Sequence, residues 1–234
     1  MTKTNQQKVK DFLINNGVII VMFILVIYTG FTSDNFFTKN NFMNILMNMS
    51  SRLVIALGIA GCVITAGCDL SAGRMIGFGA CISGMLLQRM DYSGKFFPDM
   101  QPLNVFVVAL IAMLVCAAFG TVTGFFIAYL NVPPFIATLA MMEIVYGIGL
   151  IVTNATPLGG YVEQYTNVSN GKFLGINYLI WIAIIVAAIT WFIFNMTRHG
   201  KYMYAIGGNP QAAEVAGVPV KLTLILIYMK AAAM

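Results

Sequence analysis

The sequence has few charged residues, and this shortage defines its class. Charged residues make up 9% of the 234 residues, hydrophobic residues make up 59%, and the mean hydropathy is +0.85. A 25.5 kDa chain cannot bury that much apolar surface inside a water-soluble fold, so we expect an integral membrane protein. The net charge of +5 then concerns orientation and lipid headgroups. No basic run with interleaved aromatic residues supports a nucleic-acid partner.

Catalytic and metal-binding residues are also scarce. The single histidine, His199, flanks an apolar run. The sequence therefore lacks the histidines for a Ser/His/Asp triad inside the membrane or for a histidine-based metal site. The cysteines contain no CxxC pair and are expected to be small apolar fillers: Cys62, Cys68, Cys81 and Cys116. We therefore expect no enzyme and no metal.

A nucleotide-binding loop is missing as well. No GxxxxGK[ST] motif occurs, and the Gly-Lys pairs at Gly94, Gly171 and Gly200 are each followed by an aromatic residue. We expect the chain to bind no cofactor and to hydrolyse no ATP by itself.

The long apolar runs predict an all-α, polytopic membrane helix bundle with about six transmembrane helices and the start of a seventh. The predicted spans are Gly17–Phe31, Phe42–Ala66, Arg74–Met90, Asn104–Tyr129, Phe135–Val152 and Asn177–Asn195. No small-x-small cleavage site follows the first run, so we expect it to stay as a span. From Leu222 only thirteen residues remain, about 20 Å of helix against ~30 Å of hydrocarbon.

The second span is polar in its first half, which contains Asn44, Asn48 and Arg52. Such a segment is tolerated where it lines a cavity or packs against protein. Alternatively, an interfacial helix precedes a short buried helix that begins at Leu53.

The apolar pattern breaks between Gly67 and Gly73. Two glycines bracket Asp69 and Ser71, which predicts an unwound helix followed by a newly capped one. Such a discontinuous helix indicates the translocation pathway. Three roles stay open: a hinge, direct contact with the permeant, or a cap in which Asp69 pairs with Arg74.

Glycine pairs and prolines mark further contacts and breaks. Gly73-x-x-x-Gly77 and Gly120-x-x-x-Gly124 predict close helix packing. Pro133 and Pro134 form a tight break before the fifth span. Glu143 lies near the middle of that span, where a carboxyl group is costly enough to be a functional candidate.

Basic residues show a weak orientation bias. With the N-terminus in the cytoplasm, six basic residues lie inside: Lys3, Lys8, Lys10, Arg198, Lys201 and Lys221. Four lie outside: Lys39, Arg89, Lys95 and Lys172. The positive-inside tendency favours this orientation and places residues 205–220 in the cytoplasm.

The stretch from Ala205 to Val220 predicts a short helix that is capped at both ends. Asn209 suits the N-cap, Pro210 the first helical position, and Gly217 a left-handed C-terminal cap. Its small apolar face consists of Ala212, Val215 and Ala216. Because two turns of helix are marginal alone, we expect this helix to dock against a partner.

Three stretches resemble signatures of one family. The run Ala205–Pro219, with its Gly-x-Asn-Pro-x-Ala-Ala pattern, resembles the cytoplasmic coupling loop of permease subunits in bacterial ABC importers for ribose, galactose and related sugars. The stretches Thr65–Arg74 and Pro133–Leu139 are similar to that family's other signatures. The resemblance extends from the N-terminus to about Tyr228.

The resemblance implies a multi-pass subunit of the bacterial cytoplasmic membrane that moves a monosaccharide such as galactose, methyl galactoside or ribose. It implies four partners: a separate ATPase subunit that uses ATP, a second permease copy, an extracytoplasmic sugar-binding protein and membrane lipid. The coupling loop spans residues 196–221, and its contact residues are expected to be Gly207, Gly208, Asn209, Pro210, Ala212, Ala213 and Gly217.

The resemblance also bears on the pathway. Polar candidates for contact with the sugar are Asp69, Ser71 and Asn48, with Gly67, Gly73, Pro133 and Pro134 as hinges. An uncharged residue is expected at position 143, so Glu143 is either protonated or satisfied by a neighbouring helix. The family continues beyond residue 234, so we expect residues 1–234 to be one incomplete transmembrane domain.

Two alternatives come from other classes. An ion-coupled secondary transporter would use Asp69 and Glu143, but it leaves the coupling-type loop unexplained. A non-transporting permease fragment is the other alternative.

Overall fold

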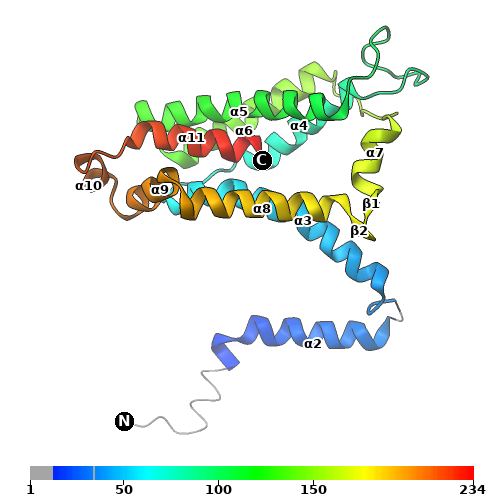
Figure 1. Ribbon diagram of the computed structural model, residues 1–234, viewed down its shortest axis with the longest axis horizontal. Helices are drawn as coiled ribbons and strands as arrows, with labels where there is room; N and C mark the ends of the chain where they lie inside the picture. The colour runs from blue at the N-terminus through cyan, green and yellow to red at the C-terminus, as the bar shows by residue number, and fades with distance from the viewer. Residues whose placement is uncertain (1–12, 34) are drawn as a thin grey trace. The chain divides into compact units, whose positions relative to one another are not determined.

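The fold is almost entirely helical. The computed structural model describes residues 13–33 and 35–234, so the lysines at positions 3, 8 and 10 lie outside the described residues. The chain divides by its contacts into two compact units, Met1–Leu46 and Met47–Met234. Each unit is described by itself, and the helices are labelled in Figure 1.

The first unit contains helix α2 (Gly17–Thr32) and the start of helix α3 (Lys39–Ile64). No residue of α2 is buried, which fits an apolar helix whose surroundings are lipid or protein. Helix α3 runs without interruption for 26 residues. The alternative of a separate interfacial helix before Leu53 is therefore wrong.

The second unit is a helix bundle. After α3 it contains α4 (Ala72–Leu86), α5 (Val105–Tyr129), α6 (Pro134–Val152), α8 (Tyr178–Met196) and α11 (Val220–Ala233). The short elements between them are α7 (Glu163–Asn170), β1 (Lys172–Phe173), β2 (Ile176–Asn177), α9 (Arg198–Gly208) and α10 (Pro210–Val215). The strands form an antiparallel hairpin in which Lys172 pairs with Asn177.

Among the described residues, four helices are long and apolar enough to cross a membrane: α3, α5, α6 and α8. Helices α2 and α4 are shorter apolar helices, so the six predicted spans are all found as helices. Side-chain caps begin two of them, since Asn104 accepts from the Phe106 N–H and Asn177 from the Leu179 N–H, at 2.9 and 2.8 Å.

The third span is shorter than predicted. Helix α4 ends at Leu86 rather than Met90, because the following backbone pairs with the loop before α7. The Leu87 carbonyl accepts from the Val162 N–H at 2.9 Å, and Gln88 forms a bridge with Tyr161. The buried Gln88 side chain also donates to the Gly159 carbonyl at 3.0 Å. Residues 88–103 and 153–177 are thus tied together at one end of this unit.

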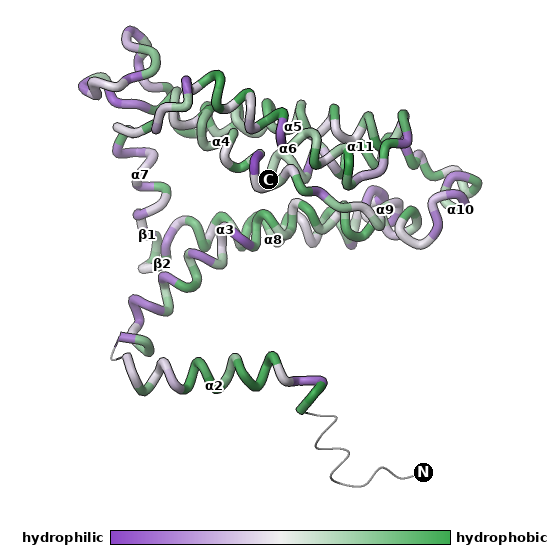
Figure 2. The backbone as a smooth tube through the Cα atoms, turned by 180° about the vertical axis from the view of Figure 1, so that it is seen from behind, coloured by the Kyte–Doolittle hydropathy of each residue, from purple (hydrophilic) through white to green (hydrophobic). Residues whose placement is uncertain are grey.

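The two ends of the bundle differ in chemistry from its middle. Helix α10 lies at one end of the second unit and the tied loops with α7 lie at the other, as Figures 1 and 2 both show. Figure 2 colours both ends largely hydrophilic and the helices between them hydrophobic. Many large apolar side chains on those helices are exposed, for example Phe106 at 85% and Ile151 at 77%. This pattern is that of a membrane bundle.

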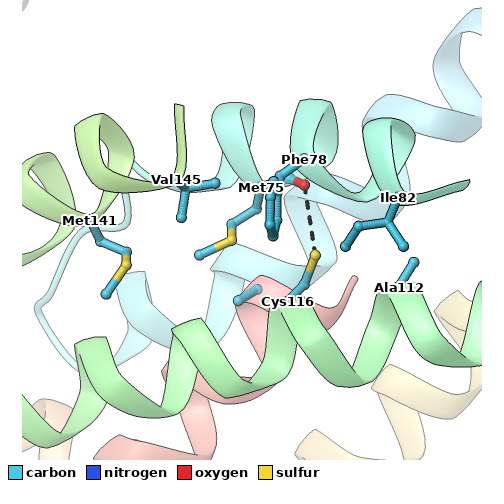
Figure 3. Packing of buried hydrophobic residues seen from close by; sticks show 8 residues of the cluster. Met75, Phe78, Ile82, Ala112, Cys116, Met141 and Val145 are labelled. Atoms are coloured by element: carbon cyan, nitrogen blue, oxygen red, sulfur yellow. Dashed lines mark hydrogen bonds between the residues drawn. The ribbon is translucent and has the colours of Figure 1, made fainter. Parts of the chain in front are cut away.

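Two apolar clusters form the core. One joins α4, α5 and α6 and includes Met75, Phe78, Cys116 and Val145. Figure 3 shows these side chains pointing toward one another, with the Cys116 thiol 3.8 Å from the Met75 carbonyl oxygen. The second cluster joins α3, α5, α8, α9 and α11. Helix α11 contributes to both, through Ala232 to the first and through residues 227, 228 and 231 to the second.

The predicted close approach at Gly120 and Gly124 is confirmed. A β-carbon at Gly124 would lie 2.7 Å from the Ile225 Cα, and one at Gly120 would lie 2.6 Å from the Ala232 Cβ. Helices α5 and α11 therefore touch backbone to backbone. Gly73 and Gly77 behave differently, since a β-carbon at either position would meet no atom within 4 Å. The predicted tight packing of that pair is not found within this chain.

We predict that Gly124→Ala destabilises the bundle. The added methyl group overlaps the α11 backbone, and overpacking of this kind costs about 1–3 kcal/mol. The change should lower the thermal unfolding midpoint in detergent. The midpoint is measured as the temperature at which the monodisperse peak is lost in size-exclusion chromatography.

Gly147→Ala on α6 is the matched control, because a β-carbon there meets nothing within 4 Å. Its midpoint should stay unchanged or rise. Equal midpoints for the two variants would contradict the close α5–α11 contact.

Candidate functional site

The break between α3 and α4 is the first candidate site, and a discontinuous helix is present as predicted. The left-handed residue in the break is Ala66, with φ +57°, rather than one of the glycines. Gly67 is needed for space, because a β-carbon there would lie 2.5 Å from the Tyr228 hydroxyl and 3.7 Å from the Pro134 Cβ. The Tyr228 hydroxyl also donates to the Cys68 carbonyl at 3.4 Å. The break is therefore held between α11 and the start of α6.

Asp69 and Ser71 bond to each other within the break. The Asp69 carboxylate accepts from the Ser71 N–H at 2.9 Å and from the Ser71 hydroxyl at 2.6 Å. Ser71 is 2% exposed and precedes the first residue of α4. Among the described residues Asp69 forms no ion pair with Arg74. Asp69 thus braces the start of α4, and this role is compatible with either a hinge or a pathway wall.

The other predicted pathway residues lie elsewhere. Asn48 lies in α3, sixteen residues before Ile64, which is about 24 Å along the helix axis from the break. Asn48 therefore does not share a site with Asp69. Gly73 lies in the first turn of α4, while Pro133 occupies the N-cap position of α6 and Pro134 its first turn.

Glu143 is the tenth of the 19 residues of α6, and its side chain is exposed. Within the part of the chain that the structure describes, no hydrogen bond or ion pair reaches its carboxylate. Satisfaction by a neighbouring helix of this chain, one of the two predicted possibilities, is therefore not found there.

The loop between α8 and α11 is the second candidate site, and its predicted caps are confirmed. The Asn209 side chain accepts from the Ala212 N–H at 3.0 Å, and Pro210 is the first residue of α10. Gly217 is left-handed, with φ +83°. The Gly217 N–H donates to the Glu214 carbonyl and the Val218 N–H to the Ala213 carbonyl, both at 3.0 Å. These two bonds close the helix in a Schellman motif.

Helix α10 presents one side outward and one side inward. Val215 is 91% exposed, and Ala212 and Ala216 are also exposed, so the predicted apolar face is uncovered. Ala213, grouped with the loop's contact residues from the sequence, is 5% exposed instead. Its side chain holds the loop against the rest of the chain, and Val215 is the outward apolar residue.

The loop is attached directly to the helix break. A β-carbon at Gly207, in the last turn of α9, would collide with the Ile64 carbonyl oxygen and lie 3.7 Å from the Thr65 Cα. The Met203 side chain lies near Gly61, where a β-carbon would be 3.2 Å from its terminal methyl. Helix α9 therefore rests on the last turn of α3. The sequence did not indicate this contact, because Gly207 was expected there to be a contact residue of the coupling loop.

His199 lies in the first turn of α9, outside the predicted spans. Burial lowers the pKa of its imidazole, and the nearby Lys230 ammonium lowers that pKa further. His199 is therefore largely neutral at pH 7.

Two residues that the sequence did not mark as a pair meet across α4 and α6. The Arg74 guanidinium lies 3.9 Å from the centre of the Tyr146 ring. Arg74 was visible in the sequence only as a possible partner of Asp69. For Tyr146, the only hint in the sequence was its position three residues after Glu143, on the same helix.

We predict that Gly207→Ala loosens the break at residues 65–71. The new methyl group pushes α9 away from the end of α3, so amide hydrogen exchange in residues 61–68 should speed up. Gly208→Ala is the control one residue away, because a β-carbon there meets nothing within 4 Å. Equal exchange in the two variants would show that α9 does not bear on the break.

Comparisons with known proteins identify the family of the chain. The family model described as "Branched-chain amino acid transport system / permease component" matches residues 41–234. The galactose/methyl galactoside import permease protein MglC of Escherichia coli K12 is 40% identical over 97% of this chain and 70% of its own length. MglC of Haemophilus influenzae is 41% identical over 98% of this chain and 70% of its length.

A further relative is the ribose import permease protein RbsC of Escherichia coli K12, 31% identical over 94% of this chain and 66% of its own length. No solved structure matches the chain. On the family match and the MglC relatives, the chain belongs to the permease components of this branched-chain amino acid transport family, whose relatives here are sugar import permeases.

Proposed function

We propose that this chain is the transmembrane permease subunit of an ATP-binding-cassette importer, which moves a monosaccharide of the galactose, methyl galactoside or ribose type across the bacterial cytoplasmic membrane. The relatives' names support the substrate class. The observation that carries the mechanism is the capped helix α10, whose outward apolar residue is unpartnered in this chain and whose supporting helix rests on the helix break.

Energy enters through α10. A separate ATPase subunit binds ATP and presents a groove to the exposed face of α10, where Val215 supplies the apolar contact. When nucleotide closes the ATPase dimer, α10 moves with the groove. The Gly207–Ile64 contact passes that movement to the end of α3 and to residues 65–71.

The pathway responds at the break. Tyr228 of α11 and Pro134 of α6 occupy the space where a side chain at position 67 would stand, so a shift of the break changes the spacing of three helices. Asp69 and Ser71 keep the first turn of α4 intact while this happens. Gly67 and Pro134 act as hinge points, and Asp69 and Ser71 form part of the wall that the sugar passes.

Two copies of the chain form the pore, and the exposed apolar sides of α2, α5, α6 and α8 face the second copy or lipid. With the N-terminus in the cytoplasm, α10 lies on the cytoplasmic side and the tied loops at residues 88–103 and 153–177 lie outside. Those outer loops receive the extracytoplasmic sugar-binding protein.

We predict that Val215→Glu abolishes co-purification of this chain with its ATPase subunit and stops sugar uptake. A carboxylate buried in an apolar contact without a partner costs several kcal/mol, enough to dissolve the complex. Tagged chain captured from detergent extracts, with the ATPase quantified by immunoblot, measures the effect.

Leu174→Glu is the matched control. It makes a comparable change at a residue that is 79% exposed, at the opposite end of the bundle between β1 and β2. It should leave ATPase binding intact. Retention of the ATPase by Val215→Glu, or uptake that continues without any ATPase subunit, would contradict the proposal, and the second result would favour an ion-coupled transporter.

A further inference from the structure

A groove between α4 and α6 has a lining that combines an arginine with an aromatic ring. Its volume is about 190 Å³, and its lining includes Gly73, Arg74 and Gly77 from α4, Tyr146 and Gly149 from α6, and Thr153 directly after α6. Gly73 and Gly77 have open space where side chains would stand. The groove is therefore accessible along the side of α4 that carries Arg74.

Arg74 is the third residue of α4, and it contacts α6 well inside that helix. Tyr146 comes twelve residues after the first residue of α6, which is about 18 Å along the helix axis. The Arg74 guanidinium lies 3.9 Å from the centre of that ring. In the described part of the chain no carboxylate pairs with Arg74, and its side chain is exposed.

An exposed arginine at this depth cannot face lipid cheaply. Even the insertion scales that give the lowest values assign a cost of about 2.5–3.5 kcal/mol to an arginine at the centre of a transmembrane helix. Arginine at such a depth faces water or a polar surface instead. The groove therefore opens onto a water-filled space or onto another polar group.

Glu143 adds a hydrogen-bond acceptor beside the groove. It precedes Tyr146 by three residues on α6, so the two side chains are neighbours on the helix surface. The carboxylate is exposed, as described above. A carboxyl group in mid-span, one turn from the ring that Arg74 contacts, is costly in lipid and useful in a pathway.

The three side chains supply what a sugar ring binds. The guanidinium donates several hydrogen bonds, the carboxylate accepts them, and the tyrosine ring offers a flat apolar face with a hydroxyl at its edge. Small-molecule sites combine a mostly apolar wall with a few such polar groups.

We propose that Arg74, Tyr146 and Glu143 form a binding station for the permeating monosaccharide, in a water-filled part of the pathway between α4 and α6. This proposal rests on the proposed function. It shifts the sugar contacts from Asp69 and Ser71, which bond to each other, to a groove one to three turns beyond the break.

The first test uses a cysteine that is already there. Cys81 lines the groove and is half-buried, whereas Cys62 and Cys116 are buried. In a Cys68→Ser chain in native membranes, Cys81 should react with the water-soluble, negatively charged reagent sodium 2-sulfonatoethyl methanethiosulfonate. Cys81→Ser is the control for background labelling. Lack of reaction at Cys81 would show that lipid or a second copy fills the groove, and would overturn the proposal.

Sugar protection is the second readout. Galactose, methyl galactoside and ribose are added separately at millimolar concentration, and at least one should slow Cys81 labelling several-fold. Sucrose at the same concentration is the osmotic control. Labelling that no monosaccharide slows would overturn the binding station, although it would leave the groove open to water.

Transport kinetics separate this proposal from the proposed function. Tyr146→Ala and Arg74→Gln should raise the half-saturation constant for uptake about tenfold, as loss of a charge-assisted or stacking contact does. Tyr146→Phe should retain most of the affinity, and all three should still co-purify with the ATPase. The control is Ile144→Ala, a residue of the same helix that is 51% exposed and does not line the groove.

The two failures differ in form. Normal half-saturation constants for Tyr146→Ala and Arg74→Gln would overturn the station while the importer function stands. A wild-type chain that neither imports these sugars nor binds the ATPase would overturn the proposed function, and Cys81 labelling then still decides whether the groove holds water.

Discussion

The backbone contact between α5 and α11 is the constraint on which the second unit depends. Helices gain little from burying apolar surface when lipid is the solvent, so close van der Waals contact has to hold them together. Gly120 and Gly124 allow that contact along two turns of α5. Because α11 belongs to both apolar clusters, the same contact joins the α4–α6 group to the group of α3, α8 and α9. The α5–α11 contact also positions Tyr228, and Tyr228 in turn holds the helix break.

Local chemistry explains what the sequence predicted well. The cap at Asn209 and the left-handed Gly217 were predicted, and each depends on residues within one turn. The caps at Asn104 and Asn177 were not predicted, although both residues were expected to begin spans. The span positions follow from long apolar runs. The end of α4 was predicted four residues too late, because a distant loop takes over the hydrogen bonding of Leu87.

Contacts between distant segments explain what the sequence could not provide. Two glycine pairs with the same spacing have different surroundings. Gly120 and Gly124 lie against α11, whereas a β-carbon at Gly73 or Gly77 would meet no atom of the described residues within 4 Å. The sequence also did not indicate which side of the six-residue helix faces inward, so Ala213 was placed among the expected contact residues although it is buried. The contact between Arg74 and Tyr146 was the hardest feature to predict. The two residues are 72 residues apart in the chain and become neighbours only when α4 packs on α6.

Asn209 belongs to two helices at once. Its backbone N–H closes the end of α9 by donating to the Ala205 carbonyl at 3.1 Å, and its side chain opens α10. No slack linker separates the two helices, so they form an elbow of fixed angle rather than a flexible joint. In an importer such an elbow transmits displacement without the loss that a soft loop would introduce. The connection is short as well, since only one residue separates Gly207 from Asn209. Under the proposed function, we therefore expect a small movement of the ATPase to reach the end of α3 through this short connection.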